Sequence, residues 1–460
     1  MKSIGVIDLN KVSFKQRADR WISFSLLLLG ATFFVAPAAS AQLRAAVVKV
    51  DITPSDSQYL LGYQERKSTG VLDKIYHRIV AIDDGTTQFF IVSSDLCLYS
   101  PSEYDKVAAR LQKQYGINPL NIWWSTTHTH SAPEVGVTGL YGIYMGDRIK
   151  HEVDAAYTAM VEQKLVDGIL EARKNLVPAR LGVGWGFSQA NINRRAIDVN
   201  GKASLGLNPD GPVDRRIGLL RLDKEDGSPL VLIANYAMHG TVMSGANLDI
   251  SGDAPGIVAE YVEKKIGAPV LYINGAAGNL APIYSTYPNW RAGHLSQFRV
   301  LLGDKILEAN AKIKSGIDNL KMVTGALTVE TPRKPGMDWS ADLAKYSVTR
   351  AGVNMVKLPV RFLKINEEIA IWSAPIELFC EVSNEVRNRS PFSYTFYFGY
   401  TNGWFGYMPT ASEWPHGGYE VETVSPFTDA AAKDLTESVV GYLHGDMKTN
   451  PSPVKSKRKK

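Results

Sequence analysis

The chain has 460 residues, of which 45% are hydrophobic and 21% are charged, a composition that is typical of globular proteins and excludes a disordered or collagen-like polymer. Its formal net charge of +5 resides at the two ends, because residues 1–41 contribute +3 and the six residues from Lys455 contribute +5, which leaves −3 for the rest. A nucleic-acid-binding protein would carry a basic body, so we expect no nucleic-acid partner. Cys97 and Cys380 lie among apolar residues, where two buried thiols are favoured over a disulfide between them.

Residues 1–41 have the pattern of a secretory signal peptide. A basic stretch precedes an apolar run of about 16 residues from Trp21 to Ala36, which is shorter than the ~20 residues that a membrane span needs. The run ends in Ala39-Ser40-Ala41, the small-residue pattern that a signal peptidase cuts. We therefore expect export to the periplasm or the medium, with the mature chain starting near Gln42. An uncleaved membrane anchor is the alternative.

Short apolar runs alternate with helical patterns along the rest of the chain. Runs rich in β-branched and aromatic residues predict strands at 45–50, 78–83, 88–93, 121–126, 180–184, 217–222, 230–237, 270–273, 321–330, 360–365 and 369–372. Amphipathic patterns predict helices at 102–115, 147–174, 254–265, 295–314, 375–387 and 430–442. This alternation favours an α/β (α+β) fold with a mixed sheet and flanking helices. We expect one domain over residues 42–446 and a basic disordered tail over 447–460, with at most peripheral membrane contact.

The motif Trp124-Ser-Thr-Thr-His128-Thr-His130-Ser-Ala-Pro133 places two histidines after an apolar run. Residues i and i+2 of an extended segment point to the same face, so the two imidazoles are expected to project side by side. Carboxyl ends of strands are where open α/β sheets place their ligand sites. The pair suits either two metal bonds or one metal bond beside a proton-transfer group. The structural alternative is a hydrogen-bonded polar pair.

Three further polar residues follow apolar runs. His239 ends the run 230–237, where a buried structural histidine is the alternative to a ligand. Asp253 is expected to cap the helix that it precedes. Glu377 follows Pro375 and is expected in the first turn of a helix, either as a surface carboxylate favoured by the helix dipole or as a carboxylate directed into a cleft.

Other motifs are weaker or absent. The sequence holds no G-x-S-x-G elbow, no H-E-x-x-H and no phosphate-binding loop. Gly182-Val-Gly184-Trp-Gly186 lacks the dinucleotide-binding spacing and predicts a strand with close packing. In the aromatic segment 401–420, Tyr407 and Tyr419 would ordinarily be packing residues.

Four separated motifs occur in a recognisable order: THTHSAP at 127–133, NYAMHGT at 235–241, SAPIE at 373–377, and NGWFGY with GGYE within 402–420. Together they resemble the catalytic domain of the neutral/alkaline, non-lysosomal ceramidases. The segments 48–54, 61–63, 93–96 and 191–194 are similar to that family as well. The resemblance covers nearly all of the chain from residue 42 onward, and it implies that residues 42–446 form a ceramidase-like catalytic domain.

The resemblance implies one zinc ion per chain, held by His128, His239, Glu377 and Tyr407. Zinc lowers the pKa of bound water and polarises a carbonyl, which suits hydrolysis of an amide. His130 would then act as general base and afterwards as general acid.

The resemblance also implies that Arg194 and Tyr419 contact the developing oxyanion. A structural salt bridge between Arg194 and Asp214 is the alternative for the arginine.

One segment departs from the family. Ceramidases carry Gly-Asp-Val-Ser-Pro-Asn, with a serine to which a nucleophilic role has been given, whereas Asn279 and Ala281 replace that aspartate and serine here. Alanine cannot attack a carbonyl, so a serine-ester route through this position is closed, whereas a zinc-water route stays open.

We therefore expect an exported zinc-dependent amidohydrolase that cleaves the N-acyl amide bond of ceramide or a related N-acyl lipid. The alternatives are a zinc hydrolase of a non-lipid amide or ester, of cell-wall or amino-sugar type, and a non-catalytic ligand-binding descendant.

Overall fold

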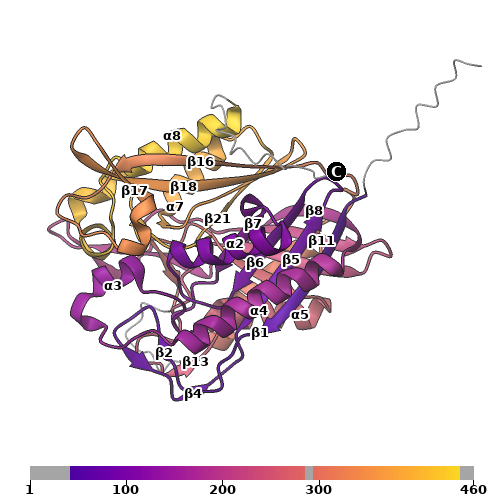
Figure 1. The fold of residues 1–460 in the computed structure, drawn as a ribbon, viewed down its shortest axis with the longest axis horizontal. Helices are drawn as coiled ribbons and strands as arrows, with labels where there is room; N and C mark the ends of the chain where they lie inside the picture. Colours follow the sequence, from indigo (N-terminus) through magenta and orange to yellow (C-terminus); the bar gives the residue numbers. More distant parts are fainter. Residues whose placement is uncertain (1–41, 285–293, 446–460) are drawn as a thin grey trace, which may run out of the picture. The chain divides into compact units, whose positions relative to one another are not determined.

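The computed structural model describes residues 42–284 and 294–445. The predicted signal peptide and the predicted basic tail lie outside the described residues. Within the described part, two β-sheets pack face to face, and helices cover the outer face of each sheet (Figure 1). This arrangement is the mixed α/β fold that the sequence predicts.

The larger sheet has eight strands in the order β14-β12-β11-β8-β1-β5-β6-β7. Only the pairs β12–β14 and β6–β7 are parallel. The strands are β14 (Val270–Asn274), β12 (Pro229–Tyr236), β11 (Arg216–Lys224), β8 (Val177–Phe187), β1 (Arg44–Asp51), β5 (Tyr76–Asp83), β6 (Gln88–Ser94) and β7 (Ile122–Thr126).

The second sheet has the order β16-β18-β19-β21, with β17 paired to β18. Its strands are β16 (Met322–Pro332), β17 (Ser347–Arg350), β18 (Val353–Ile365), β19 (Ile369–Ser373) and β21 (Tyr394–Phe398). A three-stranded sheet joins β10 (Ala203–Asn208), β9 (Asn191–Ile197) and β15 (Leu280–Pro282). Short pairs join β2 (Tyr59–Leu60) to β3 (Arg66–Lys67), β4 (Gly70–Val71) to β13 (Asp249–Ile250), and β20 (Glu377–Leu378) to β22 (Tyr407–Met408).

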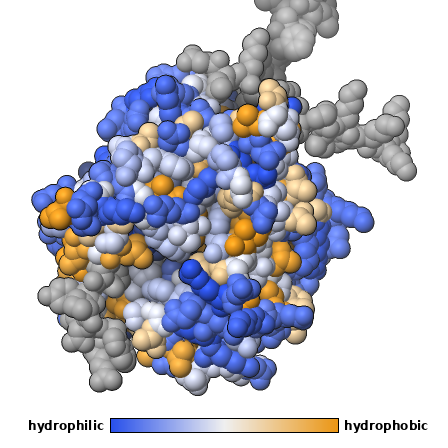
Figure 2. All heavy atoms as spheres, turned by 90° about the vertical axis from the view of Figure 1, so that its left-hand side faces the viewer, coloured by the Kyte–Doolittle hydropathy of each residue, from blue (hydrophilic) through white to orange (hydrophobic). Residues whose placement is uncertain are grey.

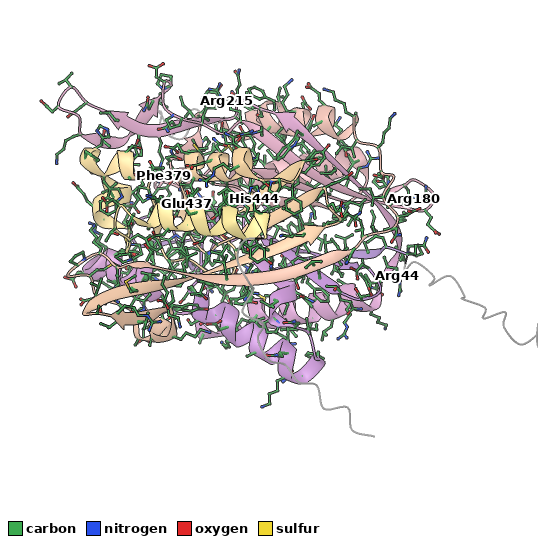
Figure 3. The ribbon with its side chains drawn as sticks, turned by 90° about the horizontal axis from the view of Figure 1, so that it is seen from above. Arg44, Arg180, Arg215, Phe379, Glu437 and His444 are labelled. Carbon is green, nitrogen blue, oxygen red and sulfur yellow. The ribbon has the colours of Figure 1, made fainter. Side chains whose placement is uncertain are left out.

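Helices cover both outer faces. On the eight-stranded sheet lie α2 (Pro101–Tyr115), α4 (Ala155–Lys174), α5 (Asp253–Ile266) and α6 (Lys305–Asn310), whereas α7 (Cys380–Arg389) and α8 (Ala431–His444) cover the second sheet. Figure 3 shows α8, which bears Glu437 and His444, lying across that sheet. The remaining helical segments are α3 (Gly139–Met145), η2 (Pro119–Asn121), η3 (Gly146–Arg148), η5 (His294–Gln297), η6 (Arg299–Asp304), η7 (Ala341–Tyr346), η8 (Ala411–His416) and η9 (Tyr419–Thr423).

The layers follow from the two-residue period of the strands. In β5, Val80 and Ile82 point into the core between the two sheets, whereas Ile79 and Ala81 point toward α2 and α4. From Ile79 to Ile82 both faces of this strand are apolar, and both are buried. A strand that is covered on both faces has a continuous run of apolar residues. This run is why the strand could be predicted from the sequence.

Each predicted strand overlaps an observed one, but three predicted helices differ from the structure. The helix predicted over 147–174 begins at Ala155, where the Asp154 carboxylate caps the first turn. The helix predicted over 375–387 begins only at Cys380. The segment predicted as one helix over 295–314 divides into η5, η6 and the short α6.

Gly182, Gly184 and Gly186 lie in β8, as predicted. Because these glycines have no Cβ atoms, the chain after α6 can pack against the strand. A Cβ atom on Gly182 would stand 2.5 Å from Ile313 Cγ2 and 3.1 Å from the Ser315 Cα. Among the described residues, no helix combines the length and apolar character needed to cross a membrane.

Replacing Gly182 by alanine should therefore destabilise the fold. Because the new methyl group meets backbone as well as side chain, we expect the free energy of unfolding to fall by about 1–3 kcal/mol, as measured by urea denaturation. Gly316→Ala is the matched control, since a Cβ atom there meets nothing within 4 Å. Equal stability of the two variants would contradict this account of the close approach.

Candidate active site

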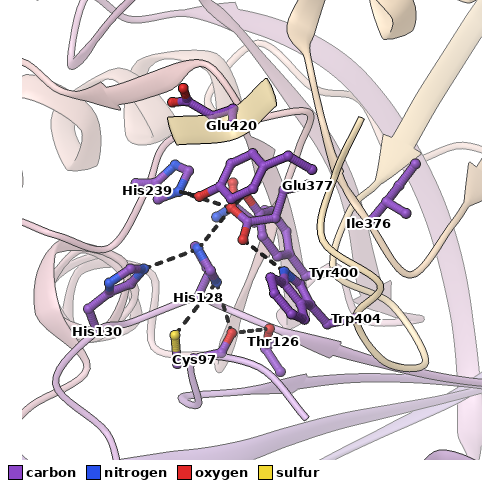
Figure 4. Close-up of polar contacts among 12 residues, drawn as sticks. Cys97, Thr126, His128, His130, His239, Ile376, Glu377, Tyr400, Trp404 and Glu420 are labelled. Atoms are coloured by element: carbon purple, nitrogen blue, oxygen red, sulfur yellow. Dashed lines mark hydrogen bonds and ion pairs between the residues drawn. The ribbon is translucent and has the colours of Figure 1, made fainter. Parts of the chain in front are cut away.

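Three side chains from distant parts of the sequence converge on one point. His128 follows β7, His239 follows β12, and Glu377 lies in β20. Glu377 Oε2 is 3.2 Å from His128 Nε2 and 3.0 Å from His239 Nε2 (Figure 4). All three side chains are buried, and their ligand atoms lie within 4.8 Å of one another.

The convergence depends on how the ends of the large sheet meet. Although β6 and β14 are far apart in the strand order, Ser93 Oγ of β6 donates a hydrogen bond to the Tyr272 carbonyl of β14. Beyond the strands, Gly240 N donates to the His128 carbonyl, and a Cβ atom on Gly240 would stand 2.7 Å from that oxygen. Only glycine allows the two histidine-bearing loops to touch in this way.

The backbone fixes the tautomer of both histidines. His128 Nδ1 is 2.9 Å from the Cys97 carbonyl, and His239 Nδ1 is 3.0 Å from the Leu280 carbonyl. A carbonyl can only accept, so each Nδ1 carries the hydrogen and each Nε2 presents a lone pair toward the Glu377 carboxylate. His128 also adopts a left-handed backbone with φ 62°, a strained conformation that is characteristic of functional sites.

Two lone pairs and a carboxylate can face one another only if a positive charge lies between them. Burial lowers the pKa of His128, but the Glu377 carboxylate outweighs burial and raises that pKa to about 10. Burial and Arg194 lower the pKa of His239 to about 3. Imidazole nitrogens with a carboxylate oxygen form a typical zinc donor set, so the residues present fit a divalent cation.

Glu377 is held by two aromatic side chains. Trp404 Nε1 donates to Glu377 Oε1 at 2.8 Å, and Tyr400 OH donates to Oε2 at 3.2 Å. The carboxylate belongs to β20, which pairs with β22 so that Glu377 lies opposite Tyr407. The prediction that Glu377 begins a helix is therefore wrong, because Glu377 N bonds to the Gly406 carbonyl and delays the helix to Cys380.

Tyr407 completes the group. Its hydroxyl is 3.1 Å from His239 Nε2 and accepts a hydrogen bond from Arg194 Nη2 at 2.9 Å. Burial raises the pKa of Tyr407 well above 10, whereas the Arg194 cation opposes that rise. A divalent cation beside the oxygen would favour the phenolate further.

Arg194 is anchored by Glu420, with 2.9 Å between Nε and Oε1. The alternative of a structural salt bridge is therefore confirmed, but its partner is Glu420 and not Asp214, which pairs with Arg216 and Arg387. The guanidinium therefore lies beside Tyr407 at the site itself.

His130 lies next to the ligand group without being part of its centre. Its Nε2 is 3.1 Å from His128 Nε2, and its buried Nδ1 has no hydrogen-bond partner in the described part of the chain. Burial, together with the neighbouring His128 and His239, lowers the pKa of His130 well below 6.5. Gly62 leaves room for the ring, since a Cβ atom there would stand 2.4 Å from His130 Nδ1.

A cavity of about 380 Å³ opens onto this group. His130, Arg194, Tyr407 and Tyr419 all line it, so the structure brings the predicted catalytic residues and one predicted ligand to a common cavity. Ala281 also lines its wall. This volume falls within the range of small-molecule sites.

The segment that departs from the family keeps a structural function. Its Leu280 carbonyl orients His239, as described above. The Asn279 amide donates to Glu381 Oε2 at 2.7 Å and accepts from Cys380 N at 3.0 Å, which ties this segment to the start of α7.

Besides Glu377, sequence reasoning misplaced a second carboxylate, and it missed several residues. Asp253 does not cap its helix from outside, as predicted, because it is the first residue of α5 and accepts from Val242 N and Met243 N instead. Tyr400, Trp404 and Glu420 were missed. Trp404 belongs to the aromatic segment 401–420, and Tyr400 directly precedes that segment.

Comparisons with known proteins identify the family of the chain. The family model described as "Neutral/alkaline non-lysosomal ceramidase, N-terminal" matches residues 44–278. The chain belongs to this family. This ceramidase-family chain is 29% identical over 257 residues to neutral ceramidase B of Dictyostelium discoideum and 27% identical over 244 residues to the neutral ceramidase of Mycobacterium tuberculosis.

Those alignments cover 54% and 50% of this chain but only 34% and 37% of the relatives. The matched part of the chain therefore corresponds to about a third of the length of these relatives. The crystal structure of neutral ceramidase from Pseudomonas aeruginosa is similar in fold, with a TM-score of 0.71 at 19% identity over 91% of this chain and 77% of that one.

Removing the indole donor to Glu377 should weaken metal binding without removing a ligand. For Trp404→Phe we expect the affinity for Zn²⁺ to fall roughly 10- to 100-fold, as measured by chelator competition, because the carboxylate loses the partner that orients it. Trp339→Phe is the matched control, since the Trp339 indole donates to the Leu343 carbonyl instead. Equal affinities for the two variants would contradict a role of Trp404 in the site.

Proposed function

We propose that this protein is a zinc-dependent amidohydrolase that cleaves the N-acyl amide bond of ceramide or a related N-acyl lipid. The observation that carries the proposal is the convergence of His128, His239 and Glu377 on one point at the wall of a cavity. Tyr407 lies beside His239, and His130 lies beside His128. The family membership supports the same reaction class. The sequence pattern of residues 1–41 supports export to the periplasm or the medium as part of this proposal.

Zinc, when bound, supplies a Lewis acid that lowers the pKa of water and polarises the amide carbonyl. The protein's own residues supply proton transfer and charge stabilisation. His130 Nε2, directed at the ligand group, accepts a proton from the attacking water and then delivers a proton to the leaving nitrogen. Without that proton the amine would have to leave as an anion.

Arg194 and Tyr419 stabilise the oxygen on which negative charge develops. Both line the cavity, and the Arg194 guanidinium is kept in place by Glu420. Donors that are fixed before the reaction need no reorganisation when charge develops, and each contributes about 3–4 kcal/mol in comparable sites.

The second candidate keeps the metal chemistry but changes the substrate. Ala281 places a methyl group in the cavity wall where the family carries a serine hydroxyl, so this position offers no nucleophile and one polar group fewer. A non-lipid amide or an ester is therefore the alternative substrate. A ligand-binding protein without turnover is the remaining alternative.

The reaction is tested with N-acylsphingosine and the zinc-loaded full chain. We expect fatty acid release that stops after exhaustive chelation, returns with Zn²⁺, and falls by at least about 1,000-fold in His128→Ala, because that variant loses a ligand of the Lewis acid. His444→Ala, which alters an exposed histidine in α8, is the control and should keep full activity. Full activity after chelation would rule out the zinc mechanism.

The part played by His130 is separable from metal binding. In His130→Gln we expect kcat to fall by roughly 100- to 10,000-fold while the zinc content stays near one per chain, because the proton acceptor is lost and the four ligands remain. Zinc content is measured by atomic emission and turnover by fatty acid release. A variant that loses zinc in parallel with activity would make His130 a ligand instead of a proton acceptor.

A further inference from the structure

The mouth of the cavity carries an arginine that the proposed chemistry does not use. Arg148 ends η3, directly after α3, and it lines the cavity together with Gln64. Its side chain is exposed, and it makes no hydrogen bond or ion pair within residues 42–284 and 294–445. Among the described residues that line the cavity, Arg194 is the other arginine, and it is paired with Glu420.

The rim that presents Arg148 is built by several specific contacts. Glu65 Oε2 accepts from Lys150 N at 2.7 Å and lies 2.9 Å from His151 Nδ1. The other nitrogen of His151 lies 2.9 Å from Glu134 Oε2, and its ring stacks on Tyr59 at 3.7 Å. These contacts join the segment after η3 to the loop between β2 and β3, so Arg148 and Gln64 are held on one rim.

The cavity wall combines apolar side chains with an arginine at its mouth, which suits an amphiphilic ligand. No aspartate or glutamate of the described residues lines it, whereas Tyr63, Met145, Leu205 and Ala281 contribute apolar surface. Apolar and charged groups lie close together on the side of the molecule that bears α3, which is the face turned to the viewer in Figure 2. An unpaired guanidinium beside apolar walls suits a ligand with a hydrocarbon part and an anionic group.

We propose that Arg148 is a specificity-determining residue that selects N-acyl amides carrying an anionic group, such as a carboxylate, over neutral ones. This inference rests on the proposed function, since it names the substrate class of the same site. A guanidinium offers a fork of N–H donors that matches the two oxygens of a carboxylate. A neutral ceramide has no group that would use this fork.

The test compares two substrates that differ only in charge. N-lauroylglycine and its methyl ester share the acyl chain and the amide bond, and release of lauric acid reports amide cleavage of both. With the zinc-loaded full chain we expect kcat/KM for the acid to exceed that for the ester by roughly 5- to 30-fold, mainly through KM, because a charge-assisted hydrogen bond is made at a partly solvated rim. In Arg148→Gln this preference should disappear, while Arg148→Lys should keep part of it.

Lys150→Gln is the matched control. It removes the same charge from an exposed residue of the same segment, two residues away, and Lys150 does not line the cavity. The control should keep the preference for the acid. If Lys150→Gln abolishes the preference as well, general electrostatic attraction explains it and the specific role of Arg148 is overturned.

A binding measurement separates this inference from the proposed function. Calorimetry with N-lauroylglycine should give a dissociation constant roughly 5- to 30-fold higher in Arg148→Gln than in the unchanged chain, whether or not the amide is cleaved. Turnover of neutral amides with no Arg148-dependent preference or binding would overturn the inference and leave the proposed function standing. Arg148-dependent binding with no turnover of any amide would support the inference and contradict the proposed function.

Discussion

The site depends on electrostatic repulsion among three buried electron-pair donors at one point. Two imidazole lone pairs face one carboxylate oxygen because backbone carbonyls of Cys97 and Leu280 hold the opposite nitrogens of His128 and His239. Acceptors buried at about 3 Å from one another repel unless a proton or a metal cation lies between them. The backbone therefore fixes three electron-pair donors around one point, where they repel one another unless a positive charge lies between them. A divalent cation can bind there with both imidazoles neutral and the carboxylate ionised.

The rest of the fold delivers these groups to the same place. The approach of β6 to β14 brings the loops after β7 and β12 together, and Gly240 allows them to touch. The pairing of β20 with β22 then adds Glu377 and Tyr407 from the far end of the sequence. The loops that carry His128 and His239 are fixed by backbone hydrogen bonds to Leu96 and Leu280, whereas Glu377 and Tyr407 are fixed by strand pairing. This suits a reaction that needs fixed geometry.

Most of the sheet could be predicted from the sequence, because buried strands such as β5 appear as continuous runs of β-branched residues. The strands β9 and β10 were missed since Asn, Arg and Gly interrupt their patterns. Glu377 was placed in a helix because Pro375 is typical of a helix start, whereas the Glu377 N–H donates a hydrogen bond to the Gly406 carbonyl, which keeps the residue extended. The support from Tyr400 and Trp404 could not be predicted, because their contacts with Glu377 depend on how the chain folds back on itself.

Anomalous diffraction at the zinc absorption edge, from crystals of the zinc-loaded full chain, tests the central claim most directly. The account predicts one strong peak at the active site, about 2.0–2.2 Å from His128 Nε2, His239 Nε2, a Glu377 carboxylate oxygen and the Tyr407 oxygen. A peak bound elsewhere, or a His128–Glu377 contact that stays direct with no metal between them, would contradict it.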